Sequence, residues 1–162
     1  MKISTRGKDT PPSPIRKLAP LANAAKKRGT KVYHLNIGQS PPEFFAGLKN
    51  FSEEVVAYEA AKGSEALCKS WSSYMNRTVG VNTKPEQFLI TCGASEALLY
   101  TFMAICDPGD EILVFDPTYA NYIGLATCAG IKLIAYPAKL EENFALPKKS
   151  EIERALTPKT KA

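Results

Sequence analysis

The part of the chain that most constrains its fold lies between residues 87 and 136, where short apolar runs alternate with helical patterns. Three runs have the composition and length of strands: 87–91, 111–115 and 131–136. A helical pattern follows Gly93, and a second one ends near Gly130. Strands that alternate with helices are typical of βαβ units, which build a largely parallel sheet with right-handed crossovers. The sequence therefore predicts an α/β fold.

The elements outside this region are predicted from start and stop residues and from composition. In chain order they are an extended arm (1–14), a helix between Pro20 and Gly29, a strand (32–35), a helix between Ser52 and Gly63, a helix capped by Ser64, a loop (79–86) and a charged helix near 148–156. The helix after Gly93 is expected to bury one apolar stripe: Leu98, Leu99, Phe102, Met103 and Ile105.

The positive charge of the chain is concentrated in its first 31 residues, which carry nine basic residues and one acid. Residues 32–162 carry twelve basic and fifteen acidic residues, so this part has a net charge of −3. A nucleic-acid-binding domain needs a basic face on its folded body, so we expect no nucleic-acid partner. The basic segment fits a solvated helix face. A targeting peptide is the alternative, but the prolines before residue 15 disfavour an amphipathic targeting helix.

The composition also argues against membrane and metal-binding classes. No apolar run reaches the roughly 18 residues that span a bilayer, and no apolar leader follows Met1. The chain has a single histidine, His34, and its four cysteines form no C-x-x-C pair, so we expect no metal site. Reduced thiols fit a cytoplasmic protein.

Two segments next to the predicted strands can carry chemistry. In TCGASEAL (91–98) a strand leads through Gly93 directly into a helix, whose first N–H groups form an anion site to which Ser95 adds a hydroxyl. A plain turn with Ser95 as the helix cap is the alternative. In DPTYANY (116–122), Tyr119 follows the next strand and is expected near the same rim of the sheet. This ring can stack on a flat ligand or simply pack at a helix start.

Several segments together resemble a known family in their order and spacing: SPIRKLAPLANAAKKRG, VYHLNIGQ, ITCGASEALLYTFMAICDPGDEILVFDPTYANY, AGIKLIAY and LTPKTKA. They resemble the N-terminal part of a fold-type I pyridoxal 5′-phosphate (PLP) aminotransferase of the class I/II, aspartate aminotransferase-like kind. The resemblance implies an incomplete three-layer αβα large domain at 51–162, holding a βαβαβ portion. Residues 1–50 then form the N-terminal arm, a helix and a substrate-side loop. It also implies that the strand at 87–91 pairs with strands from later in such a polypeptide.

The resemblance implies a cofactor role for five residues, with PLP as the cofactor. Gly93, Ala94 and Ser95 occupy the turn that holds the PLP phosphate, and Tyr119 occupies the position that stacks on the pyridine ring. Tyr58 matches a tyrosine that reaches the phosphate held by a neighbouring subunit, which implies a homodimer clasped by the N-terminal arm.

One further residue, Gly38, matches a backbone contact to the substrate carboxylate. It lies in GQSPPEF, where this chain has fewer residues than family members between the glycine and the proline-led helix. Glycine is also common in the family where this chain has Ala94.

The resemblance implies transfer of an amino group between an amino acid and a 2-oxo acid. Family members are more than twice this length, and their Schiff-base lysine lies in an S-x-S-K-like setting. These 162 residues contain no Ser-Lys dipeptide, so we assign no catalytic residue and expect a fragment that is inactive by itself. The alternatives are a non-catalytic remnant that binds a phosphorylated ligand or a protein partner, a PLP lyase of the same fold, and an unrelated small α/β binding domain.

Overall fold

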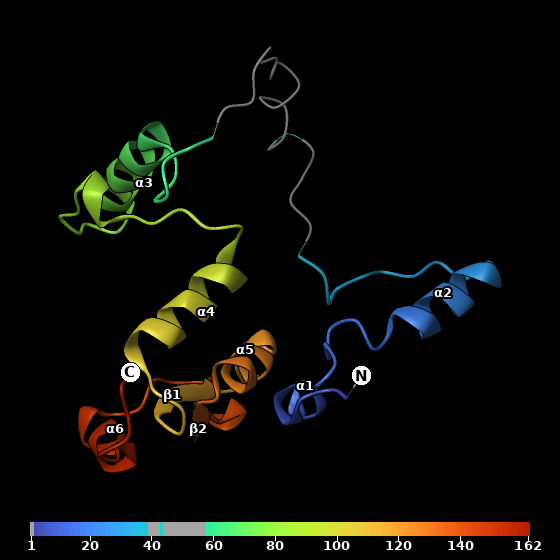
Figure 1. The fold of residues 1–162 in the computed structure, drawn as a ribbon. Coiled ribbons are helices and arrows are strands. Elements are labelled where there is room, and N and C mark those ends of the chain that lie inside the picture. Colours follow the sequence, from blue (N-terminus) through green and yellow to red (C-terminus); the bar gives the residue numbers. More distant parts are fainter. Residues whose placement is uncertain (1, 39–42, 44–57) are drawn as a thin grey trace. The chain divides into compact units, whose positions relative to one another are not determined.

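The structure is a computed structural model that describes residues 2–38, 43 and 58–162 (Figure 1). The chain divides into two compact units. Unit 1 comprises Met1–His34 and Ser95–Ala162, and unit 2 comprises Leu35–Ala94. The predicted division into 1–50 and 51–162 stays a prediction.

Unit 1 is an α/β structure, as the alternating pattern predicts. Its elements are α1 (Thr5–Asp9), α2 (Ala19–Lys27), α4 (Ala94–Ile105), β1 (Glu111–Asp116), α5 (Asn121–Ala129), β2 (Lys132–Pro137), the 3₁₀ turn η3 (Leu140–Glu142) and α6 (Lys149–Ala155). The first residue of α4 belongs to unit 2. Unit 2 contains α3 (Glu65–Thr78) and the 3₁₀ turn η2 (Pro85–Gln87).

The sheet of unit 1 consists of β1 and β2, which run parallel and are joined by α5. Ile112 lies opposite Leu133, and Phe115 lies opposite Tyr136. Gly130, in the left-handed conformation at φ 76°, ends α5 and turns the chain into β2. Two strands and their crossover helix form the βαβ unit that the sequence predicts.

The segment 159–162 lies along the other edge of β1. The Glu111 N–H donates to the Lys159 carbonyl at 2.9 Å, and the Lys161 N–H donates to the Glu111 carbonyl at 2.9 Å. Glu111 and Thr160 form a parallel bridge. In addition, the Thr157 hydroxyl donates to the Glu111 carboxylate. These contacts align residues 159–162 parallel to β1.

The core of unit 1 lies where α4 and α5 pack on one face of the sheet. Its buried residues are Phe102, Ile112, Ala126 and Ile131. The predicted stripe of α4 is correct for Phe102 and Leu98, which join this core. It is wrong for Met103 and Ile105, whose exposed fractions are 65% and 44%. No described element packs against that side of the helix, so these side chains remain in solvent.

Unit 2 is organised around α3, which begins after Ser64. The Ser64 hydroxyl accepts from the Leu67 N–H at 3.4 Å, so the predicted cap is confirmed. The following loop is held by Asn76, whose Oδ1 accepts from the Thr83 N–H at 2.7 Å and from the Thr83 hydroxyl at 2.8 Å. Ser72 also donates to the Thr83 carbonyl at 2.8 Å. Polar contacts therefore order the loop after α3.

The segment before α3 contacts the segment after η2 at Gly63. Its φ is +95°, and a Cβ placed on it would lie 2.5 Å from the Cβ of Ile90. The Ile90 N–H also donates to the Lys62 carbonyl at 2.9 Å. Only glycine allows the backbone to approach this closely in a left-handed conformation.

Four predictions for the N-terminal half are corrected. The arm contains the short helix α1, whose first turn the Ser4 hydroxyl caps. Residues 32–35 and 87–91 form no strand, because no described strand pairs with them, and Gln87 belongs to η2. Of the helix predicted between Ser52 and Gly63, residues 52–57 lie outside the described residues, and 58–62 are not helical. The helices predicted after Pro20, after Ser64, after Gly93 and near 148–156 are confirmed.

Candidate functional site

The turn at Gly93 has the geometry that the sequence predicts for an anion-binding helix start. Gly93 has φ +82°, and a Cβ placed on it would meet no atom within 4 Å. The turn is fixed by the Gly93 N–H, which donates to the Thr91 carbonyl at 2.8 Å, and by the Thr91 hydroxyl, which donates to the Gly93 carbonyl at 3.0 Å. α4 begins at the next residue, Ala94.

The first turn of α4 is exposed and carries polar groups. The backbone N–H groups of Ala94 and Ser95 have no acceptor within the helix because they belong to its first turn. Ser95 lies inside the helix, with its side chain exposed, and α4 already begins one residue earlier. The alternative role of Ser95 as the helix cap is therefore wrong.

The only acid in this first turn, Glu96, is engaged by a tyrosine one turn along the helix. The Tyr100 hydroxyl donates to the Glu96 carboxylate at 3.0 Å. This hydrogen bond, together with the negative charge of Glu96, raises the pKa of Tyr100. Sequence reasoning did not single out this pair, although its spacing of four residues on a helix is a usable signal.

Tyr119 lies in unit 1, between β1 and α5, at the carboxyl end of a parallel strand as predicted. Its side chain is 48% exposed. Its ring packs edge-to-face on Tyr122, with the ring centroids 5.5 Å apart and the planes at 84°. The Asn121 side-chain amide donates to the Tyr119 hydroxyl at 3.0 Å. Sequence reasoning did not find the role of Asn121, because a contact between residues two apart depends on how both side chains turn.

The two remaining predicted residues, Gly38 and Tyr58, belong to unit 2. Tyr58 lies outside any helix and is fully exposed. Gly38 is exposed, and a Cβ placed on it would meet no atom within 4 Å. Gly93 and Ala94 also belong to unit 2, whereas Ser95 belongs to unit 1. These three residues are consecutive and form one turn, and the boundary between the units falls within it.

Among residues 2–38, 43 and 58–162, no group of three or more His, Cys, Asp or Glu side chains is placed to hold a metal ion. Within that part of the chain, no helix combines the length and apolar character required to cross a membrane. None of the four cysteines forms a disulfide.

Curated relatives match nearly the whole chain. It is 30% identical over 165 aligned residues to a probable aspartate/prephenate aminotransferase of Thermus aquaticus, covering 99% of this chain and 43% of that protein. It is also 30% identical to an aspartate aminotransferase of Thermotoga maritima, covering 99% of this chain and 44% of that protein. The chain therefore spans less than half the length of the curated relatives it matches.

Solved structures agree with the sequence comparison. An alanine aminotransferase from Pyrococcus furiosus superimposes with a TM-score of 0.84 at 32% identity, over 98% of this chain and 42% of that one. The Thermotoga maritima aspartate aminotransferase gives a TM-score of 0.81 at 28% identity, over 98% and 43%. The family model for aminotransferase class I and II matches residues 43–162. By sequence and by fold, the chain belongs to the class I and II aminotransferases.

Proposed function

We propose that this chain is the part of a PLP-dependent aminotransferase that holds the cofactor phosphate and ring, within an enzyme that transfers an amino group between an amino acid and a 2-oxo acid. The observation that carries the proposal is the turn at Gly93, which opens directly into the exposed first turn of α4. The family assignment supports PLP as the group bound there.

The residues of this turn fit a phosphate. The open space beside Gly93 lets an oxyanion approach the backbone. The N–H groups of Ala94 and Ser95 and the Ser95 hydroxyl then donate to it, and the positive end of the α4 dipole adds to the attraction. The Gly93 N–H is already bound to Thr91, so this residue provides access and not a donor. The hydrogen bond from the Tyr100 hydroxyl holds the Glu96 carboxylate near the next turn of α4.

Tyr119 provides the aromatic contact of the proposed site. About half of its side chain is exposed, and its ring packs edge-to-face with Tyr122, so the exposed part is available to stack on a planar heterocycle. When bound, PLP supplies an electron sink for cleavage of a bond at the α-carbon of the amino acid. Ala94, Ser95 and Tyr119 bind and orient the cofactor and do not themselves move a proton.

The rest of the proposed site involves unit 2. The full exposure of Tyr58 leaves it available to the phosphate of a neighbouring subunit in a homodimer. Gly38 provides a backbone contact for the substrate carboxylate. Residues 1–50 then serve as the arm and substrate side, and 51–162 as part of the PLP-binding large domain. Four cysteines that form no disulfide support a cytoplasmic location.

The 162 residues contain no Ser-Lys dipeptide, and none of their lysines has the S-x-S-K-like setting. We therefore expect no turnover of aspartate with a 2-oxo acid when this chain is supplied with PLP. Measurable transamination by the purified chain, lost on borohydride reduction, would identify a lysine within it and overturn this point.

Binding is tested with pyridoxine 5′-phosphate, which has the ring and the phosphate but no aldehyde that reacts with surface lysines. Ser95→Ala should weaken its binding about fivefold and leave pyridoxine binding unchanged, because only the phosphorylated probe uses the hydroxyl. Ser150→Ala is the matched control, since Ser150 is the second residue of α6 as Ser95 is of α4. Equal binding of both probes by the unmodified chain would contradict the proposal, whereas equal competition by inorganic phosphate would favour a phosphate-only site.

A further inference from the structure

Asn121 is the residue that connects the Tyr119 ring to the body of unit 1. It is the first residue of α5, and its side-chain amide donates to the Tyr119 hydroxyl at 3.0 Å. Tyr122, the next residue of α5, contacts the same ring edge-to-face at 5.5 Å. Tyr119 itself precedes the helix, and its ring is contacted by two side chains from the first turn of α5.

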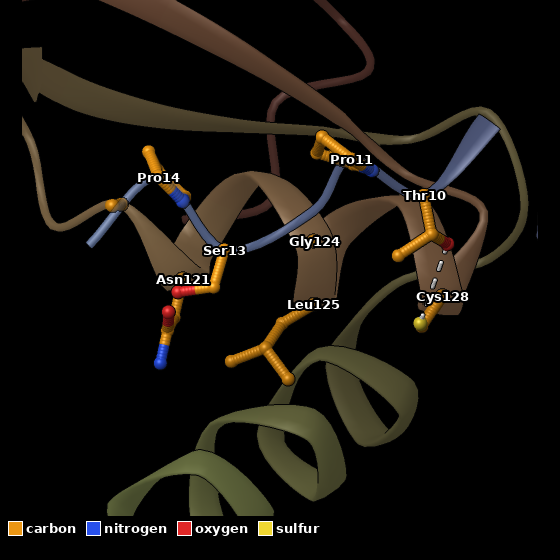
Figure 2. Close-up of a pocket in the computed structure, with 9 residues that line it drawn as sticks. Thr10, Pro11, Ser13, Pro14, Asn121, Gly124, Leu125 and Cys128 are labelled. Carbon is orange, nitrogen blue, oxygen red and sulfur yellow. Dashed lines mark hydrogen bonds between the residues drawn. The ribbon is translucent and has the colours of Figure 1, made fainter. Parts of the chain in front are cut away.

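The N-terminal arm lies beside the end of α5 that carries Asn121. Asn121 is half-buried and lines a pocket of about 250 Å³ between the arm and α5 (Figure 2). Ser13 and Pro14 contribute the arm side of this pocket. Further along the same contact, the Thr10 hydroxyl lies 3.8 Å from the Cys128 sulfur. The arm therefore lies along α5, beside both Asn121 and Cys128.

We propose that Asn121 is a positioning residue that holds the Tyr119 ring ready to stack on the cofactor ring, and this inference rests on the proposed function. A half-exposed tyrosine loses side-chain freedom when a ligand stacks on it. A hydrogen bond at the hydroxyl, together with the Tyr122 contact, removes that freedom before binding. Preorganisation of this kind raises affinity because less ordering remains to be done on binding.

The hydrogen bond to the Tyr119 hydroxyl can be reversed or removed by substitution of Asn121. In the structure, Asn121 Nδ2 donates and the Tyr119 oxygen accepts. In Asn121→Asp the carboxylate can only accept, so the Tyr119 O–H must turn toward it. In Asn121→Ala the contact is lost. The aspartate variant should therefore retain ring placement, and the alanine variant should not.

The experiment is a double-mutant cycle read out by binding of pyridoxine 5′-phosphate. Asn121→Ala and Tyr119→Phe should each weaken binding about fivefold, and the double variant should be no weaker than either single one, because both remove the same bond. The circular dichroism band of the bound probe should decrease in Asn121→Ala and persist in Asn121→Asp. Asn23→Ala, an exposed position on α2, is the matched control.

Two outcomes separate this inference from the proposed function. If Tyr119→Leu binds the probe as the unmodified chain does, Tyr119 does not contact the ring, and the proposed function loses its aromatic contact. If Tyr119→Leu weakens binding but Asn121→Ala does not, or if Asn121→Ala is equally costly in the Tyr119→Phe background, the positioning role of Asn121 is overturned. Far-UV circular dichroism of each variant shows whether α5 is retained.

Discussion

Each of the two units is stabilised internally by a different kind of interaction. In unit 1, three residues from α4, β1 and α5 and Ile131, which precedes β2, form one apolar core. In unit 2 the only buried described residues are Cys68 and Ser72, and the loop after α3 is fixed by hydrogen bonds between Thr83 and the side chains of Asn76 and Ser72. Burial of apolar area needs several elements to converge, whereas hydrogen bonds can order one short segment. The comparison predicts that removing buried side-chain volume destabilises unit 1 most. Unit 2 should respond instead to changes in its close backbone contact and its hydrogen bonds.

The largest effect is expected from a cavity in unit 1. Ile112→Ala removes a core side chain that is 7% exposed and should lower the free energy of unfolding by about 2–5 kcal/mol. Ile123→Ala, at a residue of α5 that is 49% exposed, should change it by less than about 1 kcal/mol. Urea denaturation followed by circular dichroism measures both. Equal effects would show that the four-residue core does not hold unit 1 together.

A smaller loss of stability is expected when a methyl group is added at Gly63 of unit 2, where the backbone lies close to Ile90. The methyl group of Gly63→Ala would lie 2.5 Å from the Ile90 Cβ, and the residue has φ +95°, so we expect a loss of about 1–3 kcal/mol. Gly80→Ala shares the positive φ of +76° but meets no atom within 4 Å. It should cost only the backbone strain, about 1 kcal/mol. The difference between the two variants in urea denaturation isolates the contact with Ile90.

The hydrogen bonds between Asn76 and Thr83 in unit 2 should have a local effect. Asn76→Ala removes three hydrogen bonds to Thr83 and should increase amide hydrogen exchange at Thr83 by about tenfold. The exchange of amides in β1 should not change, because that strand lies in unit 1. Asn82→Ala, an exposed position in the same loop, is the control. If exchange in β1 also accelerates, the two units unfold together.

The smallest effect concerns the cysteines of the two units. Burial, followed by the nearby Asp110 carboxylate, raises the pKa of the Cys106 thiol in unit 1. A raised pKa leaves less thiolate at pH 8, so iodoacetamide should modify Cys106 more slowly than the exposed Cys92, and its rate should rise with pH. The fully buried Cys68 should react last. Mass spectrometry of partly alkylated protein gives the order, and urea-unfolded chain, in which the order should disappear, is the control.

Much of the candidate site follows from the sequence because its signals are local. Gly93 before a helical pattern predicts a glycine turn that leads directly into a helix, and the structure has this turn, with Gly93 at φ +82°. The position of Tyr119 after a strand follows from the alternation of strands and helices. The Asn121 contact does not follow, because the two side chains must turn toward each other.

The failures in the fold have a common physical cause. Apolar runs at 32–35 and 88–91 have the composition of strands, yet a strand also needs a neighbour to satisfy its backbone groups, and no described strand pairs with them. Met103 and Ile105 have the right spacing for a buried stripe, yet burial requires an element to pack against them.

The sequence by itself determined the helix starts at Ser64 and Gly93, the βαβ alternation and the family, because capping residues, glycines and periodicity act over a few residues. Only the tertiary structure decided which apolar runs pair as strands, which face of α4 is buried and which side chains hold Tyr119. Those features depend on contacts between segments far apart in the chain or on the rotamers of neighbouring side chains, and a linear pattern specifies neither.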